Sequence, residues 1–125
     1  MEKIKVLIAD DHRVVREGLA AILKTKEDIH VVGEAQDGME AVEKARALVP
    51  DVILMDVSMP RMGGVEATRQ IKREFPHIGI VALTMYEEQQ YIFDLVRAGA
   101  TGYLLKDSES SQIVAAIRAI YRGES

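Results

Sequence analysis

The stretch Val52-Ile53-Leu54-Met55-Asp56 decides the fold that we expect of this chain. An apolar run without polar alternation is typical of a strand that is covered on both faces, as in a parallel sheet flanked by helices. The run ends at a single carboxylate, Asp56. A strand of this kind needs similar strands beside it and helices above and below, so the rest of the chain should supply both.

Working outward, short apolar runs alternate with longer segments of helical period. Strands are predicted at 4–9, 29–33, 52–55, 78–83 and 102–105, and helices at 14–24, 38–49, 64–75, 87–98 and from the N-cap Ser108 onward. The predicted inward faces are Val15, Leu19, Ile22 and Leu23; Met39, Val42, Ala45 and Val49; Val65, Thr68, Ile71 and Phe75; Ile92, Leu95 and Val96; and Ile113, Ala116, Ile117 and Ile120. The pattern predicts an α/β domain with a parallel sheet and right-handed crossovers.

Length and composition narrow the class of protein. The chain has 125 residues, which fits one domain, and its 48% apolar content is enough for a core. It has no cysteine, which excludes disulfides and thiolate chemistry, and its net charge of −4 argues against direct binding of nucleic acid. No stretch approaches the roughly 20 apolar residues of a membrane span, so we expect a soluble, cytoplasmic protein.

Polar side chains follow four of the predicted strands. Asp10 and Asp11 follow the first strand, Asp56 the third, Thr84 the fourth and Lys106 the fifth. Because ligands in open α/β sheets bind at the carboxyl ends of the strands, we expect these side chains to converge on one rim. Three close carboxylates require a neutralising cation, and Mg²⁺ suits oxygen ligands and phosphate chemistry.

The same residues indicate phosphoryl chemistry. Lys106 supplies a point charge for a phosphoryl oxygen, and Thr84 supplies a hydroxyl donor. Without cysteine, and without a serine or threonine paired with a base, a carboxylate is the expected nucleophile, which can form an acyl phosphate. Asp56 stands alone at the end of the central strand and fits that role, whereas Asp10 and Asp11 fit the cation.

Simpler explanations exist for single residues. Asp10 and Asp11 could cap the first helix, Lys106 could be solvated, and Tyr103 could be a half-buried strand aromatic. His12 is not expected to bind a metal, because a histidine that starts a helix is usually solvent-facing and Mg²⁺ prefers oxygen. The combination of residues favours a functional site.

Two enzyme or ligand-binding alternatives can be compared with this interpretation. A phosphatase with an aspartyl intermediate should have a second acid two residues after the nucleophile, where this chain has Ser58. A nucleotide or flavin binder should have a loop rich in glycine or hydroxyl residues after the first strand. That loop is Asp10-Asp11-His12-Arg13, whose carboxylates repel phosphate unless a cation intervenes.

The combined motifs resemble the receiver domains of bacterial two-component response regulators. The matching elements, which run through essentially the whole chain, are Asp10-Asp11, Asp56-Val57-Ser58-Met59-Pro60 with Gly64, Thr84, and Tyr103-Leu104-Leu105-Lys106. The Asp-Asp-His start and the Gly-Tyr-Leu-Leu-Lys-Asp stretch are similar to the NarL/FixJ subgroup, whose members carry a LuxR-type helix-turn-helix domain. The resemblance implies a flavodoxin-like, doubly wound five-stranded sheet, order 2-1-3-4-5, with five helices.

The resemblance implies a role for each site residue. Asp56 accepts the phosphoryl group, and Mg²⁺ is held directly by Asp11, Asp56 and the backbone carbonyl of Ser58, while Asp10 acts largely through water. Lys106 and Thr84 contact the phosphoryl group. No turnover is implied beyond autocatalytic phosphoryl acceptance and autodephosphorylation.

The resemblance also implies a switch and leaves its timing open. Tyr103 matches the aromatic residue that turns inward when Thr84 moves toward the phosphate. Ser58 and Tyr86 occupy positions that tune the phosphoryl lifetime in the family. Gly63 departs from the family pattern, since an Asp or Asn is frequent there.

Partners follow from the same resemblance. The phosphoryl donor is expected to be a sensor histidine kinase, and phosphorylation is expected to favour a homodimer, through either the first and last helices or the fourth and fifth. We expect residues 1–125 to form a receiver domain, with a DNA-binding domain following in a longer regulator. DNA would then be bound only through that further domain.

Overall fold

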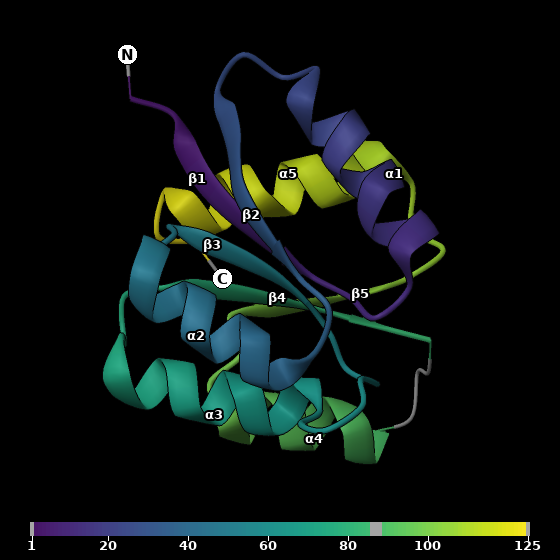
Figure 1. The fold of residues 1–125 in the computed structure, drawn as a ribbon, viewed down its shortest axis with the longest axis vertical. Helices are drawn as coiled ribbons and strands as arrows, with labels where there is room; N and C mark the ends of the chain where they lie inside the picture. Colours follow the sequence, from purple (N-terminus) through teal and green to yellow (C-terminus); the bar gives the residue numbers. More distant parts are fainter. Residues whose placement is uncertain (1, 86–88, 125) are drawn as a thin grey trace.

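The central feature of the fold is a five-stranded parallel sheet (Figure 1). The computed structural model describes residues 2–85 and 89–124, with residues 89–91 described by their backbone alone. The strands are β1 (Ile4–Ala9), β2 (Ile29–Ala35), β3 (Val52–Asp56), β4 (Gly79–Thr84) and β5 (Gly102–Leu105). They pair in parallel in the order β2-β1-β3-β4-β5, which confirms the predicted flavodoxin-like sheet.

Helices cover both faces of the sheet. They are α1 (Arg13–Lys24), α2 (Gly38–Leu48), α3 (Gly64–Glu74), α4 (Gln89–Ala98) and α5 (Ser110–Tyr121). Figure 1 shows α1 and α5 on one face and α2, α3 and α4 on the other. Helices α1 to α4 each connect two parallel strands, so every strand ends at the same edge of the sheet.

The central strand β3 explains why the decisive stretch is continuously apolar. Val52 and Leu54 pack in the cluster shared with α1 and α5, whereas Ile53 and Met55 pack in the cluster shared with α2 and α3. All four side chains are fully buried. Burial of each contributes roughly 1.5–3 kcal/mol, so β3 anchors both layers and holds the backbone of Asp56 in place.

Element boundaries differ from the prediction at several ends. β2, β3 and β4 extend to Ala35, Asp56 and Thr84, because the ladder pairing continues into these residues. The last helix has its N-cap at Glu109 and not at Ser108, since Glu109 and Gln112 form a reciprocal capping box. Residues 87 and 88, where the fourth helix was predicted to begin, lie outside the described residues.

The predicted helix faces were too wide. Five apolar side chains that were expected to face inward are substantially exposed: Val15, Ile22, Met39, Val49 and Val96. In α2, the buried positions are taken instead by the small Ala41 and Ala45 together with Val42. A narrow stripe is enough where a helix lies flat on a sheet, so residues at the margin of the stripe remain exposed.

None of the helices within residues 2–85 and 89–124 combines the length and the apolar character that crossing a bilayer requires.

Candidate functional site

The strand register brings two acidic residues side by side. Ala9 pairs with Met55 across β1 and β3, so the residues that follow, Asp10 and Asp56, meet at the carboxyl edge of the sheet. Both side chains are almost completely buried, at 1% and 2% exposure. The next residue, Asp11, lies at the entrance with 27% of its side chain exposed.

Lys106 reaches this acidic pair from the end of β5, which is separated from β3 by β4. Its Nζ lies 3.2 Å from Asp10 Oδ2 and 3.1 Å from Asp56 Oδ1. Burial lowers the pKa of Lys106, but the nearby charges of Asp56 and Asp10 outweigh that effect and raise it, so the side chain is a cation. One ammonium cannot neutralise three carboxylates, so the cluster retains an excess of negative charge.

Asp56 is a buried carboxylate that is only partly satisfied. Its Oδ1 has Lys106 and a long contact of 3.4 Å from the Ser58 amide, whereas its buried Oδ2 accepts no hydrogen bond from the described residues. Burial, and then the charge of Asp10, raise the pKa of Asp56 to about 6 from its ordinary value of 3.8. A buried oxygen without a hydrogen bond costs free energy, which a bound cation would offset.

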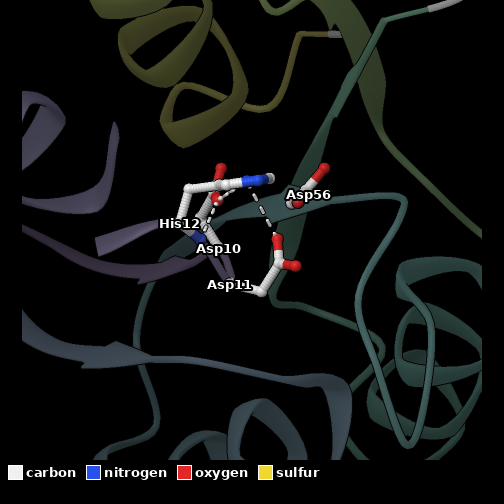
Figure 2. A group of neighbouring side chains, drawn as sticks. All are labelled: Asp10, Asp11, His12 and Asp56. Atoms are coloured by element: carbon white, nitrogen blue, oxygen red, sulfur yellow. Dashed lines mark hydrogen bonds and ion pairs between the residues drawn. The ribbon is translucent and has the colours of Figure 1, made fainter. Parts of the chain in front are cut away.

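The donor set fits a hard divalent cation. One ligand atom each from Asp10, Asp11, His12 and Asp56 lies within 4.8 Å of all the others (Figure 2). A divalent ion held by carboxylate oxygens would offset the excess charge and satisfy Asp56 Oδ2. Within this group Asp10 and Asp56 are buried, and Asp11 lies on the side that is open to solvent.

The first helix does not account for the acidic pair. The N-cap of α1 is His12, whose own side chain makes no capping hydrogen bond. Asp10 Oδ1 accepts the His12 amide at 2.8 Å, which orients the carboxylate, but Asp11 makes no capping bond among the described residues. Helix capping therefore explains part of the role of Asp10 and nothing of the position of Asp11.

The contacts of two residues near the cluster were not anticipated. His12 Nδ1 lies 3.2 Å from Asp11 Oδ1, although its side chain is 66% exposed, as expected of a residue that starts a helix. Arg16 donates from Nη1 to the backbone oxygen of Asp10 at 2.8 Å and from Nε to Glu34 at 3.0 Å. The sequence gives no sign of these contacts, because Arg16 is on a helix and its partner Glu34 is on the strand β2.

The predicted switch residues lie on β4 and β5. Thr84 is buried at the end of β4, and its backbone oxygen accepts the Lys106 amide at 2.9 Å, which links it to the site. Tyr103 is 46% exposed on β5 and lies outside the acidic cluster. Tyr86, which was singled out for its effect on phosphoryl lifetime, lies outside the described residues.

The fold and the carboxyl edge of the sheet define a class of protein. Residues 6–118 match the response regulator receiver domain, and the chain belongs to that family. The resemblance to two-component receiver domains that the motifs predicted is therefore confirmed.

Particular relatives are response regulators of the NarL and LuxR type. The chain is 48% identical over 122 residues to the response regulator protein VraR of Staphylococcus saprophyticus, a match that covers 98% of this chain and 58% of that protein. It is similar to a LuxR-family response regulator from an Aurantimonas species (TM-score 0.93, 35% identity, 98% and 88% covered). It is equally similar to the signal receiver domain of NarL from Mycobacterium tuberculosis (TM-score 0.93, 34% identity, 99% and 100% covered). The chain thus spans little more than half the length of its curated relative.

Proposed function

We propose that Asp56 accepts a phosphoryl group from a sensor histidine kinase in a reaction that depends on Mg²⁺. The observation that carries the proposal is Asp56 Oδ2, a buried carboxylate oxygen without a hydrogen bond from the described residues, beside a fixed ammonium. Asp11, Asp56 and the backbone carbonyl of Ser58 would hold the metal directly, and Asp10 would act through water. The bound ion would neutralise charge on the phosphoryl oxygens.

The chain's own residues would position the reaction. A carboxylate oxygen of Asp56 forms a bond to phosphorus while the phosphorus–nitrogen bond to the kinase histidine breaks, and its electron pair returns to the imidazole. The Nζ of Lys106 lies 3.1 Å from Asp56 Oδ1. During transfer this ammonium would pair with the arriving phosphoryl oxygens in place of the carboxylate. The Thr84 hydroxyl would donate to the same group.

Phosphorylation would change the charge at the edge of the sheet. The new group adds about −1.5 to −2 charges and three acceptor oxygens. The proposed two-state element consists of Thr84, Tyr103 and α4. The exposed side chain of Tyr103 would correspond to the state before phosphorylation. We propose that residues 1–125 are the receiver part of a longer cytoplasmic regulator that dimerises on phosphorylation and binds DNA through a further domain.

The test is phosphoryl labelling with acetyl phosphate or a cognate kinase, with and without Mg²⁺. We expect wild type to be labelled once per chain, in an acid-stable and base-labile form, and Asp56→Asn to lose the label. Asp51→Asn is the matched control, because Asp51 precedes the same strand at the opposite edge, where its carboxylate accepts the Lys5 amide at 2.8 Å. Equal labelling of wild type and Asp56→Asn would refute the assignment, and sustained hydrolysis of phosphate esters would favour a phosphatase.

A further inference from the structure

His12 lies at the entrance to the acidic cluster with no structural task for its ring. Its Nδ1 is 3.2 Å from Asp11 Oδ1 and 3.5 Å from Asp10 Oδ1. Figure 2 shows the imidazole beside the three carboxylates. The residue is the N-cap of α1, yet its side chain makes no capping hydrogen bond, so the ring is available to a ligand.

The geometry places an imidazole nitrogen within reach of the ion that the carboxylates would hold. The four donor atoms from Asp10, Asp11, His12 and Asp56 lie within 4.8 Å of one another. Two ligands on opposite sides of one small divalent ion are about 4.2 Å apart, given bonds of about 2.1 Å. The spacing of the four donor atoms is therefore close to that of ligands around one ion.

The buried oxygens supply an independent reason to expect an ion. Asp56 Oδ2 and Asp10 Oδ2 belong to side chains that are at least 98% buried, and neither accepts a hydrogen bond within the described part of the chain. Lys106 approaches Asp10 Oδ2 at 3.2 Å, but outside hydrogen-bond geometry. Both oxygens belong to the cluster that His12 borders, so an ion that satisfied them would lie near the imidazole.

A nitrogen ligand changes which ions the site prefers. Mg²⁺ favours oxygen ligands, so His12 should add little to its binding, in agreement with the expectation from sequence. Imidazole suits Ni²⁺ and Zn²⁺, so a nitrogen ligand should strengthen the binding of these ions more than that of Mg²⁺.

We propose that His12 is a specificity-determining ligand that lets this site bind divalent transition-metal ions more tightly than Mg²⁺. The inference rests on the cation site of the proposed function and adds a regulatory consequence. Because both kinds of ion would use Asp11 and Asp56, a transition metal held by His12 would compete with Mg²⁺ at the phosphorylation site. His12 would thereby make the domain sensitive to transition metals.

The experiment measures binding of Ni²⁺, Zn²⁺ and Mg²⁺ by calorimetry to wild type, His12→Gln and His77→Gln. We expect His12→Gln to lower the affinity for Ni²⁺ and Zn²⁺ at least about tenfold, since even the loss of a group that orients a metal ligand has an effect of this size. The affinity for Mg²⁺ should fall by less than about twofold. His77→Gln is the matched control, because His77 is also exposed but lies in the turn between α3 and β4. The His12 imidazole resonances should shift on addition of Zn²⁺.

The outcomes separate this inference from the proposed function. If wild type is phosphorylated with Mg²⁺ but His12→Gln weakens the binding of Ni²⁺ and Zn²⁺ by less than about twofold, the role of His12 is overturned and the function stands. If Ni²⁺ and Zn²⁺ bind through His12 but Asp56 is never phosphorylated, the function fails and the His12 ligand stands. An equal loss of affinity for all three ions in His12→Gln would show a general electrostatic or structural effect and would also overturn the inference.

Discussion

Asp37 and Asp56 are two buried aspartates near the carboxyl edge of one sheet, and they have opposite surroundings. Over the whole residue, Asp37 is 5% exposed and Asp56 is 1% exposed, so burial alone does not distinguish them. Asp37 Oδ1 accepts the Glu40 amide at 2.8 Å, and its Oδ2 accepts Arg61 Nε at 2.9 Å. Asp56 has one oxygen without such a partner among the described residues.

The pKa of each carboxyl group reflects this difference. The Glu40 amide, assisted by Arg61, lowers the pKa of Asp37 despite its burial. Burial and the neighbouring Asp10 raise the pKa of Asp56 to about 6. Asp37, whose oxygens are satisfied, stabilises the fold by capping α2. The unsatisfied oxygen of Asp56 lowers stability and indicates a ligand-binding site.

The largest effect should come from the backbone that fixes Asp56. A Cβ on Gly64 would collide with the carbonyl oxygen of Asp56 and approach the Cα of Val57 at 2.8 Å, and neither atom can move freely. We expect Gly64→Ala to lower the free energy of unfolding by about 3 kcal/mol, measured by urea denaturation, and to slow phosphoryl labelling.

Gly18→Ala is the control for that substitution. A Cβ at Gly18 meets no atom within 4 Å, and the residue is inside α1, so we expect a gain of about 0.5–1 kcal/mol. If Gly64→Ala were as stable as wild type, the Asp56 backbone would be less rigid than β3 suggests.

The second effect tests the satisfied member of the comparison. Asp37→Ala removes the cap of α2 and the partner of Arg61, so we expect a loss of about 2 kcal/mol in the free energy of unfolding. Asp37→Asn keeps an oxygen for the Glu40 amide and should lose less. A loss of under about 0.5 kcal/mol for Asp37→Ala would contradict the structural role, and chemical denaturation measures both variants.

The third effect has the opposite sign. Without metal, Asp56→Asn should raise the free energy of unfolding by about 1 kcal/mol at pH 8, because it removes a buried negative charge that the neighbouring carboxylates repel. The folded-state pKa of about 6 lies above the ordinary 3.8, so the folded wild type holds an extra proton between these values. The contribution of Asp56 to wild-type stability should therefore fall as pH rises from about 4 to about 6.

That advantage of Asp56→Asn should vanish near pH 4, where wild-type Asp56 is protonated. Asp37 behaves in reverse, since its lowered pKa makes its contribution present above the unfolded value of 3.8 and lost as the pH falls through its folded value. A variant Asp56→Asn that is less stable than wild type at pH 8 would show that Lys106 already offsets the repulsion.

The smallest effect concerns the cap of α3, which lacks what α2 has. Gly63 is the N-cap of α3 with an ordinary φ of −78° and no side-chain cap, and a Cβ there would lie 3.4 Å from the nearest atom, the carbonyl oxygen of Val57. Gly63→Asp should add a few tenths of a kcal/mol by giving α3 the cap that Asp37 gives α2. Thermal denaturation at several pH values checks this, and a loss above about 0.5 kcal/mol would indicate crowding against Val57.

Much of the site could be predicted, because its residues directly follow strands. Asp10, Asp56, Thr84 and Lys106 each stand at or just after a strand end, and the parallel sheet carries all of them to one edge. Arg16 and the contact of His12 with Asp11 could not be predicted, since each depends on a side-chain direction that no periodicity encodes.

The sequence by itself determined the layered α/β architecture, because continuous apolar runs and helical stripes can be buried together only in that way. It also placed the acidic residues and Lys106 at strand ends. Only the tertiary structure decided which buried carboxylate is satisfied. Asp37 and Asp56 are the same residue type, and their opposite pKa shifts arise from the Glu40 amide and Arg61 in one case and from burial and Asp10 in the other. Those partners are set by packing in three dimensions.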